Sequence, residues 1–248
     1  MKLNKITALV IGIIGSLLTS SGWAAIALDR TRVIVNETDK AVSLNISNQN
    51  KQLPYLAQGW IEDVDGDKIT SPLVILPPVQ RIEPGEKSQL KIQVLPAANL
   101  LARDRETLYY FNLREIPPKS DKPNTLQIAL QTRIKLFYRP AGIVPSRTDM
   151  ANPWQEKLTL TRQGDRFIVN NPTPYFVTLI DANAKGGKSI AGFEPLMVSP
   201  KASGELKASA KALGNSPELT YVNDYGGRPT LSFNCSGTTC KVVSSSTK

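Results

Sequence analysis

Apolar and polar residues alternate along most of the chain in short segments. Strand-like alternation or β-branched composition marks residues 33–35, 41–47, 55–62, 88–95 and 108–113, and it resumes after residue 140 in KLTLTR, DRFIVNN, YFVTLIDA, ELTYVNDY, PTLSFNC and CKVVS. Proline, glycine and Asn/Asp turns separate these segments at intervals of roughly ten residues, which is typical of sandwiches or barrels. The one helix-like segment, residues 96–104, is short and is predicted to be a crossover turn. The pattern predicts an all-β protein with about seven strands in each half.

The boundary between the two halves is expected where the sequence interrupts both strands and helices. Residues 139–154 (RPAGIVPSRTDMANPW) contain three prolines and one glycine, which interrupt regular structure. We therefore predict a first β-sandwich domain at residues 25–140, a hinge at 141–153 and a second domain at 154–248, with a cleft between the two domains. A single large sandwich is the alternative that the pattern leaves open.

The first residues have the features of a secretory signal peptide. Lys2 and Lys5 precede an apolar run, residues 6–18, and small residues then lead to Ala24 and Ala25. A transmembrane anchor is disfavoured because the run is shorter than the roughly 20 apolar residues that span a bilayer. We predict a signal peptide at residues 1–24, cleavage between Ala24 and Ala25, and export without stable membrane insertion.

The chain is basic, and its formal net charge of +9 becomes +7 when the two lysines of the signal peptide are removed. Such a balance suits nucleic acid, an anionic surface or an acidic partner. Export argues against nucleic acid, and the cations are spread along the chain rather than clustered with aromatic residues. We interpret them as a solvated surface.

Cys235 and Cys240 are the only cysteines, and they flank a four-residue polar turn in FNCSGTTCKV. In an oxidising compartment this arrangement predicts a disulfide across a hairpin. A redox pair or a zinc site fits poorly, because the spacing differs from those motifs and the chain contains no histidine.

The absence of histidine excludes a Ser-His-Asp triad and a histidine metal site. GGKS at residues 186–189 lacks the earlier glycine that a phosphate-binding loop requires, since Ala182 stands there. Spacing does not test a paired-carboxylate site, because such pairs assemble in three dimensions. We predict no catalytic residue, no metal and no cofactor.

Residues 125–140 (TLQIALQTRIKLFYRP) combine an apolar alternation with closely spaced cations. Leucine or isoleucine occupies the even positions 126, 128, 130, 134 and 136, and Arg133, Lys135 and Arg139 carry the charge. We predict a strand over residues 126–136, longer than the usual five or six residues. Either it is a central strand whose even positions face the core, or it is an edge segment that offers backbone groups and apolar side chains to a partner strand.

Several segments resemble the periplasmic pilus (fimbrial) assembly chaperones. The resemblance runs in order from about Ala25 to Cys240, through ALDRTR, NKQLPYLAQGWIE, PPVQRIEPG, LARDRETLYYFNLREIPP, LQIALQTRIKLFYRP, NPTPY and NDYGGRPTLSF. It implies two immunoglobulin-like domains in an L shape and a non-enzymatic chaperone. In that family the chaperone completes an incomplete pilus subunit with a strand of its own, and an outer-membrane usher then receives the subunit.

The resemblance also implies roles for individual residues. Arg32 and Lys135 match the pair that binds the terminal carboxylate of the subunit, and Leu126, Ile128 and Leu130 match the donor strand. The residues that match the ion network between the domains are Glu106, Arg139 and Asp224. Lys135 has odd parity, whereas the donor residues are even, so in a regular strand they would face opposite sides. A local twist, a bulge or a bent lysine stem would bring Lys135 into the cleft, and the pattern leaves these alternatives open.

Other features of the resemblance concern the class of pilus and the rival functions. The connection KSDKPNT is short, which resembles the chaperones of rod-like, adhesive-tipped pili, and the departures from the family lie mainly at residues 181–194 and 201–218. The alternative function is a pilin or adhesin-like structural subunit, which should have one incomplete domain. An export-pathway enzyme on a sandwich scaffold is disfavoured by the lack of histidine and of a nucleophile motif.

Overall fold

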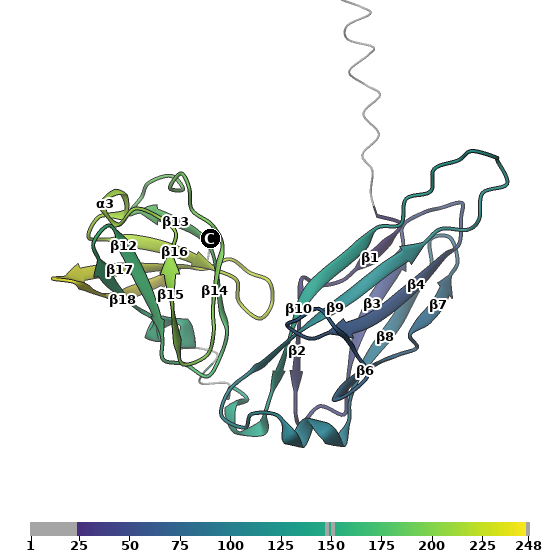
Figure 1. Cartoon of the computed structure of the whole chain (residues 1–248), viewed down its shortest axis with the longest axis horizontal. Helices are drawn as coiled ribbons and strands as arrows, with labels where there is room; N and C mark the ends of the chain where they lie inside the picture. The colour runs from purple at the N-terminus through teal and green to yellow at the C-terminus, as the bar shows by residue number, and fades with distance from the viewer. Residues whose placement is uncertain (1–23, 147–148, 150–151, 247–248) are drawn as a thin grey trace, which may run out of the picture.

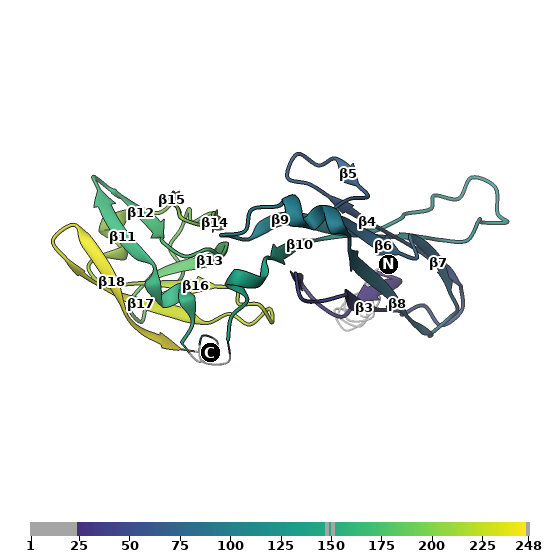
Figure 2. The same ribbon diagram turned by 90° about the horizontal axis from the view of Figure 1, so that it is seen from below.

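The computed structural model describes residues 24–146, 149 and 152–246, which form two β-sandwich domains arranged as the arms of an L (Figure 1). Strand β10 (Gln131–Arg139) runs through the first arm towards the connection between the domains (Figure 2). The predicted all-β class with two immunoglobulin-like domains is confirmed. The predicted signal peptide lies outside the described residues apart from Ala24, and the domain limits of 25–140 and 154–248 stay a prediction.

The first domain packs two sheets face to face. One sheet is antiparallel and contains, in order, β1 (Ile26–Leu28), β3 (Ala41–Asn48), β8 (Lys87–Val94) and β6 (Leu73–Leu76). The other contains, in order, β2 (Arg32–Asn36), β10, β9 (Thr107–Ile116), β4 (Tyr55–Glu62) and β5 (Lys68–Ile69), with β7 (Val79–Ile82) paired to β4. In this second sheet β2 runs parallel to β10, whereas β10 and β9 are antiparallel.

Strand periodicity explains how these segments form a core. In β8 the side chains of Leu90 and Ile92 are buried, whereas the alternate Lys91 is exposed. Leu90 packs in one apolar cluster with Ile61 of β4 and Phe111 of β9. Each such side chain contributes about 1.5 to 3 kcal/mol when it is fully buried. The predicted crossover turn is the 3-10 helix η2 (Pro96–Leu100), which leads from β8 towards β9.

The strand predicted at residues 126–136 is only partly present. β10 begins at Gln131, and residues 126–130 are all exposed, so the alternative of a central strand whose even positions face the core does not hold for them. Leu136 is fully buried, as predicted, and Ile134 packs against the core. The physical reason lies in β9, which ends at Ile116 and is followed by two prolines that have no backbone N–H for a ladder.

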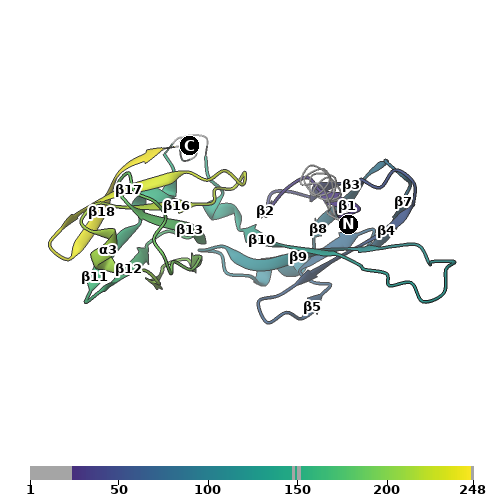
Figure 3. The same cartoon turned by 90° about the horizontal axis from the view of Figure 1, so that it is seen from above.

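The segment between β9 and β10 therefore projects beyond its sandwich, at the end farthest from the second domain (Figures 1, 2 and 3). Its last backbone contact with the sheet is the N–H of Glu115, which donates to the Leu130 carbonyl at 3.0 Å.

The second domain is a single antiparallel path of eight strands in the described residues. Its order is β14 (Leu196–Val198), β13 (Val177–Ala184), β16 (Pro217–Tyr221), β17 (Thr230–Ser236), β18 (Thr239–Ser246), β11 (Thr159–Gln163), β12 (Arg166–Asn171) and β15 (Ala202–Leu206). Short helices are η3 (Ala141–Ile143), η4 (Trp154–Lys157) and α3 (Ala210–Leu213). Phe167, Leu179 and Phe233 are buried in its core.

The predicted disulfide is confirmed. Cys235 and Cys240 lie opposite each other in the β17–β18 hairpin and are bonded. Because the two residues are close in sequence, the bond closes one hairpin and leaves the rest of the domain to the apolar core.

Candidate functional site

The two predicted anchor residues lie side by side although they are far apart in sequence. In the parallel pairing of β2 with β10, Lys135 is the register partner of Arg32. The next residues of the two strands, Val33 and Leu136, are fully buried in the core. Because side chains alternate along a strand, Arg32 and Lys135 share the opposite face of the sheet.

The regular alternation of β10 explains which way the side chain of Lys135 points. The β10–β9 pairing runs from Gln131 to Tyr138 without a register shift, so no bulge is present there. Of the three alternatives, a local twist, a bulge and a bent stem, the bulge is therefore absent. Its odd position already directs it away from the core of the first domain, beside Phe137, whose ring lies 5.7 Å from that of Phe176 in the second domain.

Both cations bind neutral oxygens of the second domain. Nη1 of Arg32 donates to the carbonyl of Val222 at 2.9 Å, and Nζ of Lys135 donates to Oγ1 of Thr178 at 3.2 Å. Neither cation has a carboxylate within 4.0 Å among the described residues, and the buried Nε of Arg32 has no hydrogen-bond partner there. The pair therefore has donor capacity left for an anion.

Burial and mutual repulsion act on the charge of this pair. Burial, and then the nearby Arg32, lower the pKa of the Lys135 ammonium. Burial also lowers the pKa of Arg32, although the charges of Asp224 and Glu106 oppose this effect. An anion between the two cations would relieve the repulsion and favour both charged forms. The arrangement is electrostatically suited to a carboxylate.

A cavity of about 390 Å³ lies beside Arg32, between the domains. Its walls include Ile34 and Asn36 of β2 and, from the second domain, Asp224 and Tyr225. The predicted cleft between the domains is therefore present, and Arg32 is on its wall.

The predicted donor residues are exposed rather than packed. The exposed fractions are 85% for Leu126, 66% for Ile128 and 44% for Leu130. They continue the even positions of β10 beyond the point where the sandwich ends. Three neighbouring apolar side chains of this kind are unusual on the surface of a monomer and suggest an interaction site.

One edge of β10 is open next to the cations. β9 pairs with β10 from Gln131 onward, whereas β2 pairs with the other edge only from Lys135 to Arg139. Among the described residues, positions 131–134 of β10 therefore pair with β9 on one edge and have no partner strand on the other. This open edge ends at Arg32, the first residue of β2. A strand added at this edge would end at the two cations.

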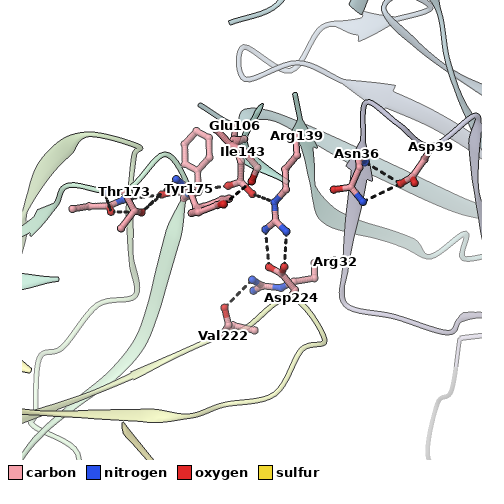
Figure 4. Close-up of polar contacts among 12 residues, drawn as sticks. Arg32, Asn36, Asp39, Glu106, Arg139, Ile143, Thr173, Tyr175, Val222 and Asp224 are labelled. Carbon is pink, nitrogen blue, oxygen red and sulfur yellow. Dashed lines mark hydrogen bonds and ion pairs between the residues drawn. The ribbon is translucent and has the colours of Figure 1, made fainter. Parts of the chain in front are cut away.

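The three residues of the predicted ion network are in contact at the hinge (Figure 4). Nε of Arg139 lies 2.6 Å from Oε1 of Glu106, and its two terminal nitrogens bind the Asp224 carboxylate at 2.6 and 2.9 Å. The second Glu106 oxygen accepts a hydrogen bond from the N–H of Phe176 at 2.7 Å. Glu106 and Arg139 come from the first domain, so the network joins the two domains.

Burial dominates the protonation of this network. It raises the pKa of Glu106 to about 7, against the opposing effects of Arg139 and the Phe176 N–H, and the Asp224 carboxylate adds to the rise. Arg139 lies between the two carboxylates and the nearby Arg32 also interacts with both, so burial rather than an excess of negative charge dominates the pKa of Glu106. The pKa of Arg139 is raised overall, because the bonds and charges of its two partners outweigh burial.

Sequence reasoning missed the residues of the second domain that complete the site. Thr178, Phe176 and the carbonyl of Val222 each contact a predicted site residue, yet none was assigned a role. In the sequence, Val222 and Thr178 lie in the strand-like segments ELTYVNDY and YFVTLIDA, which do not mark them as site residues. Only the neighbouring segments NPTPY and NDYGGRP resembled the family. Their function depends on the placement of the second domain against the first.

Comparison with known proteins now adds the decisive observation. Residues 25–144 match the family model for the pili and flagellar-assembly chaperone, PapD N-terminal domain, and residues 153–233 match the pili assembly chaperone PapD, C-terminal domain. The chain belongs to the PapD family of pilus-assembly chaperones. The matched ranges together cover most of the chain and include all eight residues of the predicted anchor, donor segment and ion network.

Individual members of the PapD family are similar over nearly the whole chain. The probable fimbrial chaperone YfcS of Escherichia coli (strain K12) is 52% identical over 96% of this chain and 94% of its own length. The chaperone protein PapD of Escherichia coli is 50% identical over 90% of this chain and 92% of its own length. These relatives are chaperones, which favours that function over a structural subunit or an enzyme.

Solved structures of the family have the same fold. The periplasmic chaperone SfaE has a TM-score of 0.66 and 33% identity, with 84% of this chain and 98% of that chain covered. The SafB chaperone in complex with the SafA pilin of Salmonella enterica has a TM-score of 0.68 and 28% identity, with 84% and 95% covered.

Among residues 24–146, 149 and 152–246, no helix is long and apolar enough to cross a membrane. The same residues contain no group of three or more acidic or cysteine side chains placed to hold a metal ion.

Proposed function

We propose that this protein is a periplasmic chaperone that captures pilus subunits by donor-strand complementation. Residues 126–130 enter an incomplete subunit as a strand, Arg32 and Lys135 bind the carboxylate at the end of the subunit chain, and an outer-membrane usher then receives the subunit. The observation that carries the proposal is the open edge of β10, which ends at two cations without a carboxylate partner among the described residues.

The anchor determines register as well as affinity. A strand can slip along an open edge, and a shift by one residue turns every side chain to the other face. A carboxylate bound at Arg32 and Lys135 stops the added strand at one position. Charge-assisted hydrogen bonds of this kind contribute about 1.5 to 3 kcal/mol each.

Neither element binds strongly alone. Burial of Leu126, Ile128 and Leu130 in a subunit contributes on the order of 5 to 9 kcal/mol, whereas association costs about 4 to 15 kcal/mol. The apolar contacts, the backbone ladder and the anchor are needed together. The similar SafB chaperone, solved with a pilin, supports pilus subunits as the partner class.

We infer export to the periplasm as part of the same proposal. The predicted signal peptide and the similarity to fimbrial chaperones support a location on the route that subunits follow to the cell surface. The disulfide Cys235–Cys240 agrees with an oxidising compartment.

The test is recovery of subunits from periplasm with tagged chaperone. Wild type should retain subunits, and Arg32→Ala and Lys135→Ala should each lower the recovery at least tenfold while the chaperone stays folded. Lys91→Ala is the matched control, because Lys91 is an exposed lysine of β8, in the other sheet of the first domain. Unchanged recovery with either cleft variant would overturn the anchor.

A further inference from the structure

A loop of the second domain contacts the anchor and the hinge network at once. We define the 222–227 loop as the residues that follow β16, and it projects towards β2 of the first domain (Figures 1 and 3). Its Val222 carbonyl accepts from Nη1 of Arg32 at 2.9 Å. Two residues later, the Asp224 carboxylate binds Arg139. Both arginines are therefore held by the same short loop.

One side chain closes this loop. Oδ1 of Asn223 accepts hydrogen bonds from the N–H groups of Tyr225 at 3.1 Å and Gly227 at 2.8 Å. The backbone N–H of Asn223 also donates to the Gly227 carbonyl at 3.0 Å. A loop with this many internal bonds keeps its shape, so the Val222 carbonyl and the Asp224 carboxylate keep a fixed spacing.

The tip of the loop rests on the residue before the anchor. Gly226 has φ +82°, and a Cβ at this position would lie 2.8 Å from Oγ1 of Thr31. Such a distance is shorter than a van der Waals contact, and the positive φ favours glycine. Only a residue without a side chain allows the loop to approach β2 this closely.

The approach of the loop determines how Arg32 is presented. Val222 occupies one terminal nitrogen of the guanidinium, and Nε has no partner among the described residues. The loop thus holds the guanidinium by one terminal nitrogen. A change in the position of the loop would alter the orientation of Arg32.

We propose that Asn223 and Gly226 are positioning residues for the carboxylate anchor. The loop that they shape holds Arg32 in the orientation that receives a free terminal carboxylate, and it thereby makes the chaperone selective for a chain end over an internal or amidated segment. This inference rests on the proposed function. It gives the second domain a role in recognising the subunit carboxylate. Binding of the subunit to β10 of the first domain would not by itself need that role.

The test compares two synthetic peptides of alternating valine and threonine that differ only at the C-terminus, one with a carboxylate and one with an amide. Isothermal titration calorimetry on the full chain gives the ratio of the two dissociation constants. Wild type should bind the acid at least about tenfold more tightly, as expected for one charge-assisted hydrogen bond. In Gly226→Ala and Asn223→Ala this ratio should fall below about threefold, with amide binding unchanged.

Controls separate positioning from a general structural effect. Gly164→Ala introduces the same substitution at φ +59° in the second domain, with nothing within 4 Å of the new Cβ, and should keep the wild-type ratio. The double variant Thr31→Ala/Gly226→Ala removes the overlapping Oγ1 and should recover most of the ratio. If Gly226→Ala alone fails to fold, Asn223→Ala provides the measurement.

The outcomes distinguish the two proposals. A wild-type ratio near one would refute the carboxylate anchor and the proposed function with it. A wild-type ratio of tenfold that persists in folded Gly226→Ala and Asn223→Ala, or an equal loss of acid and amide binding in them, would overturn the positioning role and leave the anchor intact.

Discussion

Lys135 lies directly beside Arg32 in the parallel pairing of β10 with β2, and both side chains face away from the core. Like charges on neighbouring strands destabilise a sheet. Here the pair is also partly removed from water, and its hydrogen-bond partners among the described residues are neutral oxygens. The arrangement lowers the stability of the free chaperone, and a bound carboxylate would recover that loss.

The pH dependence of anchoring follows from Lys135. Because burial and Arg32 lower the pKa of its ammonium below the ordinary value of 10.5, the charge that binds a carboxylate is lost at a lower pH than in a free lysine. Affinity for the acid peptide should therefore fall as the pH rises towards 10.5. Lys135→Arg should remove this fall, because arginine stays charged. Titration calorimetry at several pH values checks both, and identical profiles for the two proteins would contradict the assignment.

The donor segment is predicted to function outside the fold of the free chaperone. Ile128→Asp should leave the unfolding midpoint unchanged, because the side chain is 66% exposed. It should lower subunit recovery by at least about tenfold, since burial of one isoleucine contributes roughly 1.5 to 3 kcal/mol.

The matched control for this variant is Ala129→Asp. Residue 129 projects to the opposite side of an extended strand and should keep more of the binding. Leu136→Asp marks the limit of the segment, because this side chain is fully buried and its replacement should unfold the domain. Loss of folding in Ile128→Asp would show that its side chain contributes to the core.

The hinge should take up a proton between pH 4.5 and 7. The pKa of Glu106 rises from 4.5 to about 7 on folding, so the native state binds more protons than the unfolded state in this window. The contribution of Glu106 to the free energy of unfolding is fully present below pH 4.5 and is lost as the pH rises through 7. This change is on the order of 3 kcal/mol. The free energy of unfolding of the wild type minus that of Glu106→Gln should therefore fall as the pH rises from 4.5 to 7, because glutamine does not titrate.

Urea unfolding at several pH values measures that difference. Glu86→Gln serves as the control, because Glu86 is exposed and should show no comparable trend. A difference between wild type and Glu106→Gln that stays constant from pH 4.5 to 7 would argue against proton uptake by Glu106.

Removal of the disulfide should have a local effect. The double variant Cys235→Ala/Cys240→Ala should lose about 2 kcal/mol of unfolding free energy, because the closed loop is short. Subunit recovery should stay at the wild-type level, since the hairpin is remote from Arg32 and Lys135. Urea unfolding and periplasmic co-purification test the two parts, and loss of recovery in a folded variant would refute the local role.

Local pattern was sufficient for much of the fold. The alternation in residues 88–95 predicted β8 and its buried positions, and the cysteine spacing predicted the β17–β18 hairpin with its disulfide. These features depend on contacts between residues close in sequence, so periodicity and turn chemistry determine them. The roles of individual site residues came from the family resemblance, and those roles remain to be tested by the variants above.

Tertiary structure decided what alternation could not. The pattern of residues 126–136 is continuous, but its first part is exposed because the partner strand β9 stops before the prolines at 117 and 118. The meeting of Arg32 with Lys135 depends on the parallel register of strands from opposite ends of the first domain, and their partners Val222 and Thr178 depend on the docking of the second. The sequence by itself thus determined which side chains could bind an anion or a strand. Strand pairing and the contact between the domains determined which of these side chains meet. The reason is that packing brings together residues far apart in sequence, and periodicity describes only residues close in sequence.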